Sequence, residues 1–303
     1  MGRIQRTWQI MRLSWDILRN NPSLAMFPVL AFSCFLVSMI AFAIPVSTLS
    51  GQSIGSTFHA LYEMNLTPQG ESDSQTLFLY GVAIFAFYFV TTLIGTFFTA
   101  AFVVSVSNYM NGQAATFRDG LKAASSHLAK IATWSLISAT VGLLLRLSEH
   151  VLKRSRLQWG EAIAAAIVLL IGIPWVMATY FLVPIMILRN EGPLTAMKES
   201  ARLLKNSWAE QLLSSVGFGT VSMLLILIGI LVSLPFLLIL LPTLALGGLF
   251  VFIVLIMIYG FGVSLITGTC ESIFQVVLYR HLTEEPILPE FRPILADLPV
   301  SSK

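Results

Sequence analysis

The residues best suited to chemistry in this 303-residue chain are few and far apart. No H-E-x-x-H pattern, mixed His/Cys metal spacing, G-x-S-x-G elbow or glycine-rich phosphate loop occurs. The four histidines lie apart in sequence: His59, His127, His150 and His281. Both cysteines, Cys34 and Cys270, fall inside apolar runs, where thiols are usually packed and inert. We therefore expect no enzyme activity, no cofactor and no metal.

Ionisable side chains at the ends of apolar runs are the next place where chemistry could reside. Glu271 and Arg146 stand there, and charges at membrane depth are costly and often functional, although both side chains can snorkel to the interface. We predict that Glu271 ends the last span at the cytoplasmic face and that the helix continues to His281. A basic cluster follows the third apolar run: Arg146, Lys153, Arg154 and Arg156. It is interpreted either as a contact for lipid headgroups or a partner, or as a solvated loop.

Small residues recur every four positions in two of the apolar runs. The first set is Thr91, Gly95 and Thr99, and the second is Gly260, Ser264 and Gly268. Such spacing lets another helix backbone approach closely, so we predict helix contacts at both sets. The alternative interpretation is that the glycines line a substrate path.

The composition determines the elements that must position these residues. Hydrophobic residues make up 56% of the chain and charged residues only 11%, and the mean hydropathy is +0.83, whereas soluble domains carry roughly 25% charged residues. A soluble globular protein is excluded, and the basic residues beside the apolar runs indicate topology rather than nucleic-acid binding. We predict an all-α polytopic transmembrane helical bundle with about six spans. The expected spans are residues 24–46, 77–106, 131–147, 162–188, 212–234 and 244–270.

Prolines predict how some spans bend or end. The last two spans share one uncharged block, and the turn between them is predicted from Pro235, Pro242, Gly247 and Gly248. Pro28, Pro174 and Pro184 each remove a backbone hydrogen bond and can kink a span.

The distribution of Lys and Arg predicts the orientation. Alternate segments, starting with the N-terminus, carry 14 of these residues, and the opposite segments carry 4. By the positive-inside rule both termini lie in the cytoplasm, so residues 1–23 form a cytoplasmic interfacial helix and residues 271–303 a cytoplasmic tail. All four bases on the other side belong to the third loop, where the basic cluster lies. We predict that this loop is nevertheless external, because moving it inside would require a second apolar run also to fail to cross.

An internal repeat is indicated by the segments that precede the odd-numbered spans. Each has apolar residues at helical steps of 4, 3 and 4 with basic residues beside them. The three stripes are Ile4, Trp8, Met11 and Trp15; Phe117, Leu121, Ala124 and Leu128; and Met197, Ala201, Leu204 and Trp208. We predict three amphipathic interfacial helices in a pseudo-threefold repeat of interfacial helix plus transmembrane hairpin. Coincidence of spacing is the rival explanation.

Three stretches of the chain resemble a known family. They are W-Q-I-M-R-L-S-W-D-I-L-R-N-N-P-S-L-A-M-F-P from Trp8, G-P-L-T-A-M-K-E-S-A-R-L-L-K-N-S-W-A-E from Gly192 and I-F-Q-V-V-L-Y-R from Ile273. They look like an uncharacterised family of six-span prokaryotic integral membrane proteins and, more distantly, the membrane domain fused to some glycerophosphodiester phosphodiesterases. The resemblance implies a fold and localisation in the membrane, and it implies no active site.

The function indicated is a noncatalytic membrane-organising or accessory role in the cell membrane. The expected partners are membrane lipids, with a protein partner or a second copy of the chain as further interpretations, and no nucleic acid. The alternative is a transporter of a small solute or lipid, which the repeat and the proline-containing fourth span favour. Against transport stands the lack of paired charges in the middle of the spans.

Overall fold

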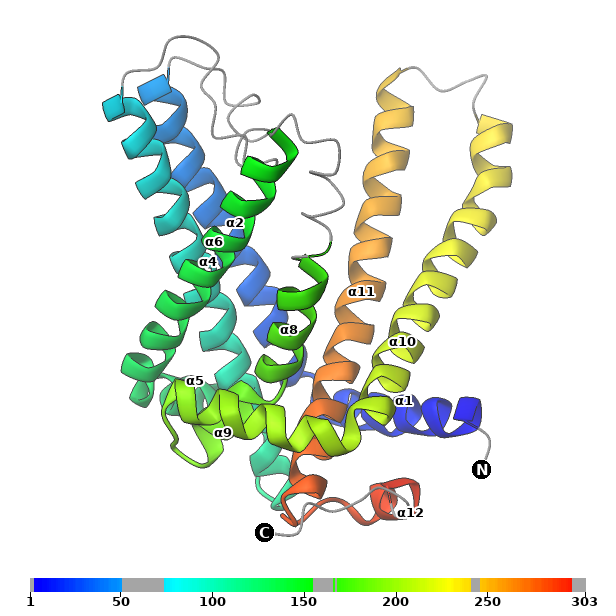
Figure 1. Cartoon of the computed structure of the whole chain (residues 1–303). Helices are drawn as coiled ribbons and strands as arrows, with labels where there is room; N and C mark the ends of the chain where they lie inside the picture. Colours follow the sequence, from blue (N-terminus) through cyan, green and yellow to red (C-terminus); the bar gives the residue numbers. More distant parts are fainter. Residues whose placement is uncertain (1–2, 51–73, 155–165, 167, 241–245, 296–303) are drawn as a thin grey trace. The chain divides into compact units, whose positions relative to one another are not determined.

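The computed structural model describes residues 3–50, 74–154, 166, 168–240 and 246–295, and these ranges are helical without a strand (Figure 1). Within them, six stretches are long and apolar enough to cross a membrane: Ser23–Thr48, Gly81–Met110, Leu128–Leu145, Leu170–Leu188, Gly217–Leu237 and Gly248–Leu282. The predicted all-α polytopic bundle is confirmed. Each stretch has 18 residues or more, and roughly 20 residues of helix cross a hydrocarbon core.

The helices are bounded as follows: α1 Arg3–Asn20, α2 Ser23–Ser50, α4 Ser74–Met110, α5 Phe117–Ser126, α6 Leu128–Arg154, α8 Ile173–Thr179, α9 Leu182–Leu188, α10 Pro193–Leu240, α11 Leu246–Leu282 and α12 Arg292–Leu295. A π-helical turn η1, Val168–Gly172, precedes α8, and a 3₁₀ turn η2, Pro289–Phe291, precedes α12. The chain forms two compact units, each described by itself below. The first contains Met1–Pro28, Ser105–Phe117 and Arg202–Lys303, and the second contains Val29–Val104 and Arg118–Ala201.

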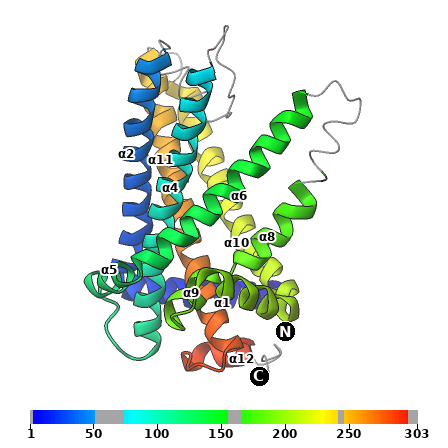
Figure 2. The same ribbon diagram turned by 60° about the vertical axis from the view of Figure 1, so that its left-hand side comes forward.

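In the first unit, α1 crosses and packs against the lower part of α11 (Figures 1 and 2). α1 ends before α2 begins, because Pro22 cannot continue a helix. The last backbone hydrogen bond of α1 runs from the amide of Asn21 to the Ile17 carbonyl at 3.0 Å. After the break, the Ser23 hydroxyl donates to the Ala115 carbonyl at 2.9 Å. The connection between α1 and α2 is thereby tied to the segment that follows α4.

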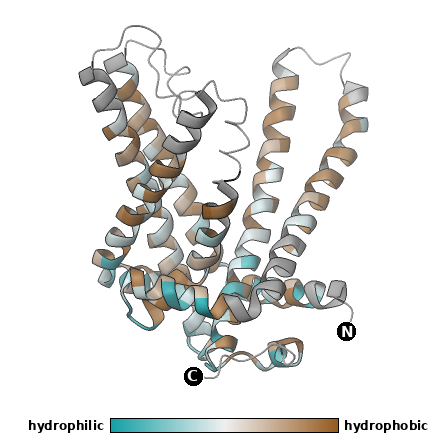
Figure 3. Ribbon diagram, in the orientation of Figure 1, coloured by the Kyte–Doolittle hydropathy of each residue, from teal (hydrophilic) through white to brown (hydrophobic). Residues whose placement is uncertain are grey.

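The surroundings of α11 change along its length. Above Cys270 its large apolar side chains are exposed, as Leu255 and Met257 show at 59% and 68%. This part is coloured mainly as hydrophobic in Figure 3. From Cys270 onward most side chains are buried, and Ile273 and Val277 are fully enclosed. The exposed apolar part of α11 before Cys270 is therefore the part suited to contact lipid, and the part after Cys270 packs within the first unit.

Aromatic contacts hold the second unit together. Phe87 of α4 lies between two phenylalanines of α2, Phe35 and Phe42, with ring centroids 6.3 and 5.6 Å away. Trp134 of α6 stacks on Trp175 of α8 with centroids 5.6 Å apart and an interplanar angle of 15°. Aromatic pairs at these separations contribute about 0.5–1.5 kcal/mol beyond their buried area.

The fourth span differs from the single predicted run 162–188, because it is broken. α8 ends at Thr179 and α9 begins at Leu182, so the kink expected from the two prolines is present. At the break, the Phe181 amide donates to the Ser200 hydroxyl at 2.9 Å, and both residues are fully buried. The side chain of Ser200 therefore satisfies a backbone donor that a continuous helix would have paired.

The residues predicted to place the turn of the last hairpin are only partly confirmed. Pro235 lies inside α10, which continues to Leu240, and Gly247 and Gly248 lie inside α11. Pro242 falls between the two helices, outside the described residues. The segment predicted as the third interfacial helix, Met197 to Trp208, is continuous with the fifth span, because both belong to α10, a helix of 48 residues. Proline within membrane helices is tolerated where local adjustments satisfy the freed carbonyl.

Each segment of the predicted repeat contains a fully buried small residue. Ser14 in α1, Ala124 in α5 and Ser200 in α10 are each fully buried. Ala124 belongs to the predicted stripe of its segment, whereas Ser14 and Ser200 lie outside theirs, and Trp8 of the first stripe is 62% exposed. A small side chain permits close packing, whereas an apolar stripe can instead face lipid.

Candidate functional site

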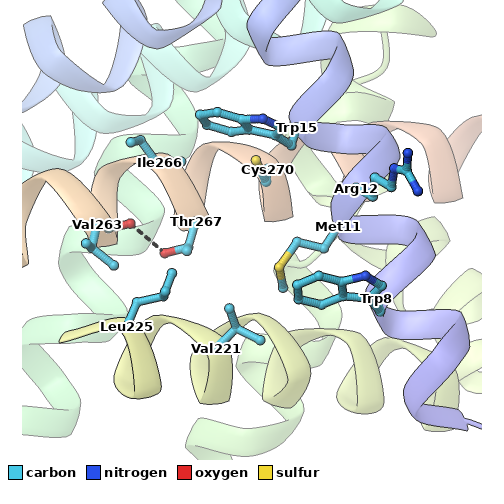
Figure 4. Close-up of a pocket in the computed structure, with 10 residues that line it drawn as sticks. All are labelled: Trp8, Met11, Arg12, Trp15, Val221, Leu225, Val263, Ile266, Thr267 and Cys270. Carbon is cyan, nitrogen blue, oxygen red and sulfur yellow. Dashed lines mark hydrogen bonds between the residues drawn. The ribbon is translucent and has the colours of Figure 1, made fainter. Parts of the chain in front are cut away.

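A cavity of about 420 Å³ lies between α1 and the hairpin of α10 and α11, all within the first unit (Figure 4). From α1 come Trp8, Met11, Arg12 and Trp15. From the hairpin come Val221, Leu225, Val263, Ile266, Thr267 and Cys270. Its volume falls in the range of about 300–1,000 Å³ that holds small ligands. We call it the α1 cavity.

The wall of the α1 cavity is apolar apart from its rim. The hydroxyl of Thr267 donates to the Val263 carbonyl of its own helix at 2.9 Å, so it offers no free donor to a ligand (Figure 4). Cys270 is a free, buried thiol and behaves as a small hydrophobic group. A ligand inside would meet hydrocarbon, two indole rings and sulfur.

The charge at the α1 cavity belongs to Arg12. Its guanidinium points away from the apolar side chains (Figure 4), and its side chain is exposed. Asp16 lies four residues on, yet no ion pair joins Arg12 to it or to another carboxylate in the described ranges. The site therefore combines an apolar interior with one cation at its edge.

The faces of α1 explain why its tryptophans reach the cavity. Ile10, Ser14 and Ile17 follow steps of 4 and 3 and are buried against the protein. Trp8 and Trp15 lie on a neighbouring face and stay 62% and 42% exposed. Sequence reasoning identified the tryptophan stripe but missed this second, packed face, because Ser14 interrupts its apolar pattern.

A close approach within the hairpin supports the far side of the cavity. The hydroxyl of Tyr259 on α11 donates to the carbonyl of Leu225 on α10 at 2.8 Å. A Cβ added to Gly229 would lie 2.1 Å from Cε1 of the same tyrosine ring. Gly229 thus leaves the space that the tyrosine ring occupies, and sequence reasoning missed it because no four-residue repeat of small residues surrounds it.

The glycines predicted to lie at helix contacts face open space in the described chain. A Cβ added to Gly95, Gly260 or Gly268 would meet no atom within 4 Å. Gly95 and Gly268 are exposed, as are Thr99 and Ser264, while Thr91 bonds back to its own helix through the Phe87 carbonyl. The prediction of close helix approaches there is wrong within the described chain. The spacing fits open faces of the helices equally well.

A buried arginine fixes the lower end of α11. Arg280 is 2% exposed and donates to the carbonyl and hydroxyl oxygens of Ser107 at 2.8 and 2.9 Å. It also donates to the side-chain oxygen of Asn111 at 2.6 Å, and its Nε lies 3.6 Å from Glu285. These bonds join α11 to the end of α4 and to the tail. Sequence reasoning missed this role, because Arg280 looked like an ordinary base beyond a span.

The remaining predicted residues are placed as follows. Glu271 is partly exposed, one residue after the burial change at Cys270, and α11 continues past it to Leu282 as predicted. Arg146, Lys153 and Arg154 belong to α6, but their side chains lie outside the described residues, as does all of Arg156. In the described ranges, no group of three or more His, Cys, Asp or Glu residues is arranged to hold a metal ion.

Comparison with known proteins identifies a family. The family of unknown function DUF6159 matches residues 78–285, more than half of the chain, and the chain belongs to it. No curated protein and no solved structure matches. The more distant similarity to the membrane domain of glycerophosphodiester phosphodiesterases is not shown, and the family brings no known activity.

Proposed function

We propose that this member of the DUF6159 family is a noncatalytic accessory protein of the cell membrane that binds lipid where its spans meet the cytoplasmic interface. The observation that carries the proposal is the α1 cavity, an apolar space between a tryptophan-bearing helix and a lipid-exposed hairpin. An amphipathic helix with aromatic residues on its apolar face suits the boundary between headgroups and acyl chains.

The cytoplasmic orientation rests on charge. The segments assigned to the side of the N-terminus carry 14 of the 18 Lys and Arg residues. Cytoplasmic segments hold such an excess. Anionic headgroups of the inner leaflet would attract these bases at about 1 kcal/mol each.

The proposed role is noncatalytic because the described lining of the α1 cavity supports binding better than chemistry. The only charged side chain on the α1 cavity among the described residues is Arg12, and the Thr267 hydroxyl is bonded within its own helix. General acid–base or nucleophilic chemistry needs a titratable group beside a second group that activates or orients it. The cavity offers binding without such a pair.

Native mass spectrometry of the full chain, released from a gentle detergent, tests the proposal. We expect phospholipid adducts that survive activation sufficient to strip the detergent. Replacing both Trp8 and Trp15 by Gln should reduce them, whereas replacing Leu136 and Leu144 by Gln provides a control of exposed apolar residues on another helix. A spectrum without lipid adducts would contradict lipid binding.

A transporter of a small solute or lipid is the second candidate, favoured by the broken fourth span. Discontinuous helices in transporters offer freed backbone groups to a substrate. Here the freed amide of Phe181 is already bonded to Ser200, and both residues are fully buried, which favours a structural break. Counterflow of labelled phospholipid across sealed proteoliposomes would distinguish the candidates, since an accessory protein gives no protein-dependent transfer.

A further inference from the structure

We infer that the α1 cavity holds one acyl chain of a membrane phospholipid while Arg12 binds the phosphate of the same molecule. This inference rests on the proposed lipid-binding function and deepens it by naming the ligand and the residue that recognises its headgroup. It joins the apolar space to the cation at its rim, two features with no intramolecular use in the described chain.

The position of the cavity fits the depth of a phospholipid's upper acyl chain. Cys270 is both a lining residue and the point at which the apolar side chains of α11 change from largely exposed to enclosed. Leu225 and Ile266 line the cavity and remain 40% and 38% exposed, so the cavity is continuous with the lipid-facing surface of the hairpin. An acyl chain can therefore enter sideways from the bilayer without crossing a polar barrier.

The chemistry of the lining selects hydrocarbon. A polar solute would leave its hydrogen-bonding groups unpaired, because the Thr267 hydroxyl is bonded to the Val263 carbonyl. Burying an unpaired polar group costs about 1–3 kcal/mol. Hydrocarbon has no such cost and gains contact with the two indole rings.

The charge at the rim selects a phosphate rather than a neutral headgroup. The guanidinium of Arg12 is exposed and has no described carboxylate partner, and its planar donors match phosphate oxygens. Arg19 lies seven residues further along α1, is also exposed and does not line the cavity. It therefore provides a matched control for a nonspecific attraction between the helix and anionic lipid.

Fluorescence quenching by brominated lipid provides the test. The full chain is prepared with Trp134, Trp159, Trp175 and Trp208 replaced by Phe, so that only Trp8 and Trp15 emit. Phosphatidylglycerol with brominated acyl chains is titrated into the protein in neutral detergent. We expect saturable quenching, because bromine on the bound chain lies beside the cavity tryptophans.

Two pairs of variants locate the bound lipid. Arg12→Gln should weaken the apparent affinity about 3- to 10-fold, the loss expected for one charge-assisted contact, while Arg19→Gln changes it little. Thr267→Phe should abolish saturable quenching by filling the cavity, while Ser264→Phe, on an exposed position of the same helix, should not. A brominated alkyl maltoside, which lacks phosphate, should bind the parent and Arg12→Gln equally.

The outcomes separate this inference from the proposed function. Linear quenching without saturation, or an unchanged affinity in both Arg12→Gln and Thr267→Phe, would overturn the inference. If phospholipid adducts persist in the mass spectrum under that outcome, lipid binding stands and its site lies elsewhere; if they are absent, both fail. Arg12→Gln removes no buried contact, so it remains decisive even if Thr267→Phe does not fold.

Discussion

The close contact between Gly229 and Tyr259 allows the packing of the α10–α11 hairpin, which forms the far side of the α1 cavity, to be tested by one substitution. In Gly229→Ala the new methyl carbon would lie 2.1 Å from Cε1 and 2.6 Å from Cζ of the tyrosine ring. Carbon atoms normally approach to about 3.5–4.0 Å, so the ring must move by roughly 1.5 Å. That movement would stretch or break the 2.8 Å hydrogen bond from the hydroxyl to the Leu225 carbonyl.

The expected size follows from opposing terms. Overpacking costs about 1–3 kcal/mol, and the lost hydrogen bond adds about 0.5–1 kcal/mol. The better helix propensity of alanine stabilises the helix by about 1 kcal/mol relative to glycine. We expect a net destabilisation of about 0.5–3 kcal/mol for Gly229→Ala. Gly219→Ala in the same helix, where an added Cβ meets nothing within 4 Å, should be neutral or stabilising.

Thermal unfolding of both variants in one detergent measures the difference. Gly229→Ala should melt several degrees below Gly219→Ala. In a Tyr259→Phe background the hydrogen bond is already absent, so the cost of Gly229→Ala should be smaller than in the parent. If the two alanine variants melt alike, the ring swings freely into lipid and the described hairpin contact does not hold α10 to α11.

Three further outcomes are expected. Arg280→Met should lower the free energy of unfolding by about 1.5–3 kcal/mol, because it removes the charge-assisted hydrogen bonds that join α11 to the end of α4. Arg292→Met, at an exposed position near the C-terminus, should change melting little, and equal melting of the two variants would refute the buried role. Gly268→Leu should change the free energy of unfolding by no more than about 0.5 kcal/mol, because a side chain at this position would point into open space. A large loss of stability would reveal a contact that the described chain does not contain. Single cysteines at Ser74 and Ser155 should both react with an impermeant maleimide on intact cells, and labelling of the second only after permeabilisation would contradict the six-span topology.

The spans and their helical class could be predicted from the sequence because membrane helices depend on long, uncharged apolar runs. The 60 residues between Glu210 and Glu271 contain no charge, which predicts two spans whatever they pack against. The position of the turn could not be predicted in the same way. Pro235 stops a helix in water, yet α10 continues through it.

The α1 cavity could not be predicted from the sequence, because it is formed by tertiary contacts that no local pattern encodes. Trp8 and Trp15 were identified as one face of α1, but their proximity to Thr267 and Cys270 depends on how α1 crosses α11. Sequence spacing selected Gly268, which faces open space, and passed over the Gly229 that meets a ring. Spacing shows that a close approach is permitted, whereas only the partner shows that it occurs.

Photocrosslinking with a phospholipid that carries a diazirine in its acyl chain tests the central claim most directly. The protein is reconstituted at low lipid-probe concentration, irradiated and digested, and the labelled residues are mapped. Binding in the α1 cavity predicts labels concentrated at Met11, Leu225 and Cys270, with competition by unlabelled phospholipid. Labels spread evenly over exposed apolar residues such as Val37 and Leu144, without competition, would contradict a defined lipid site.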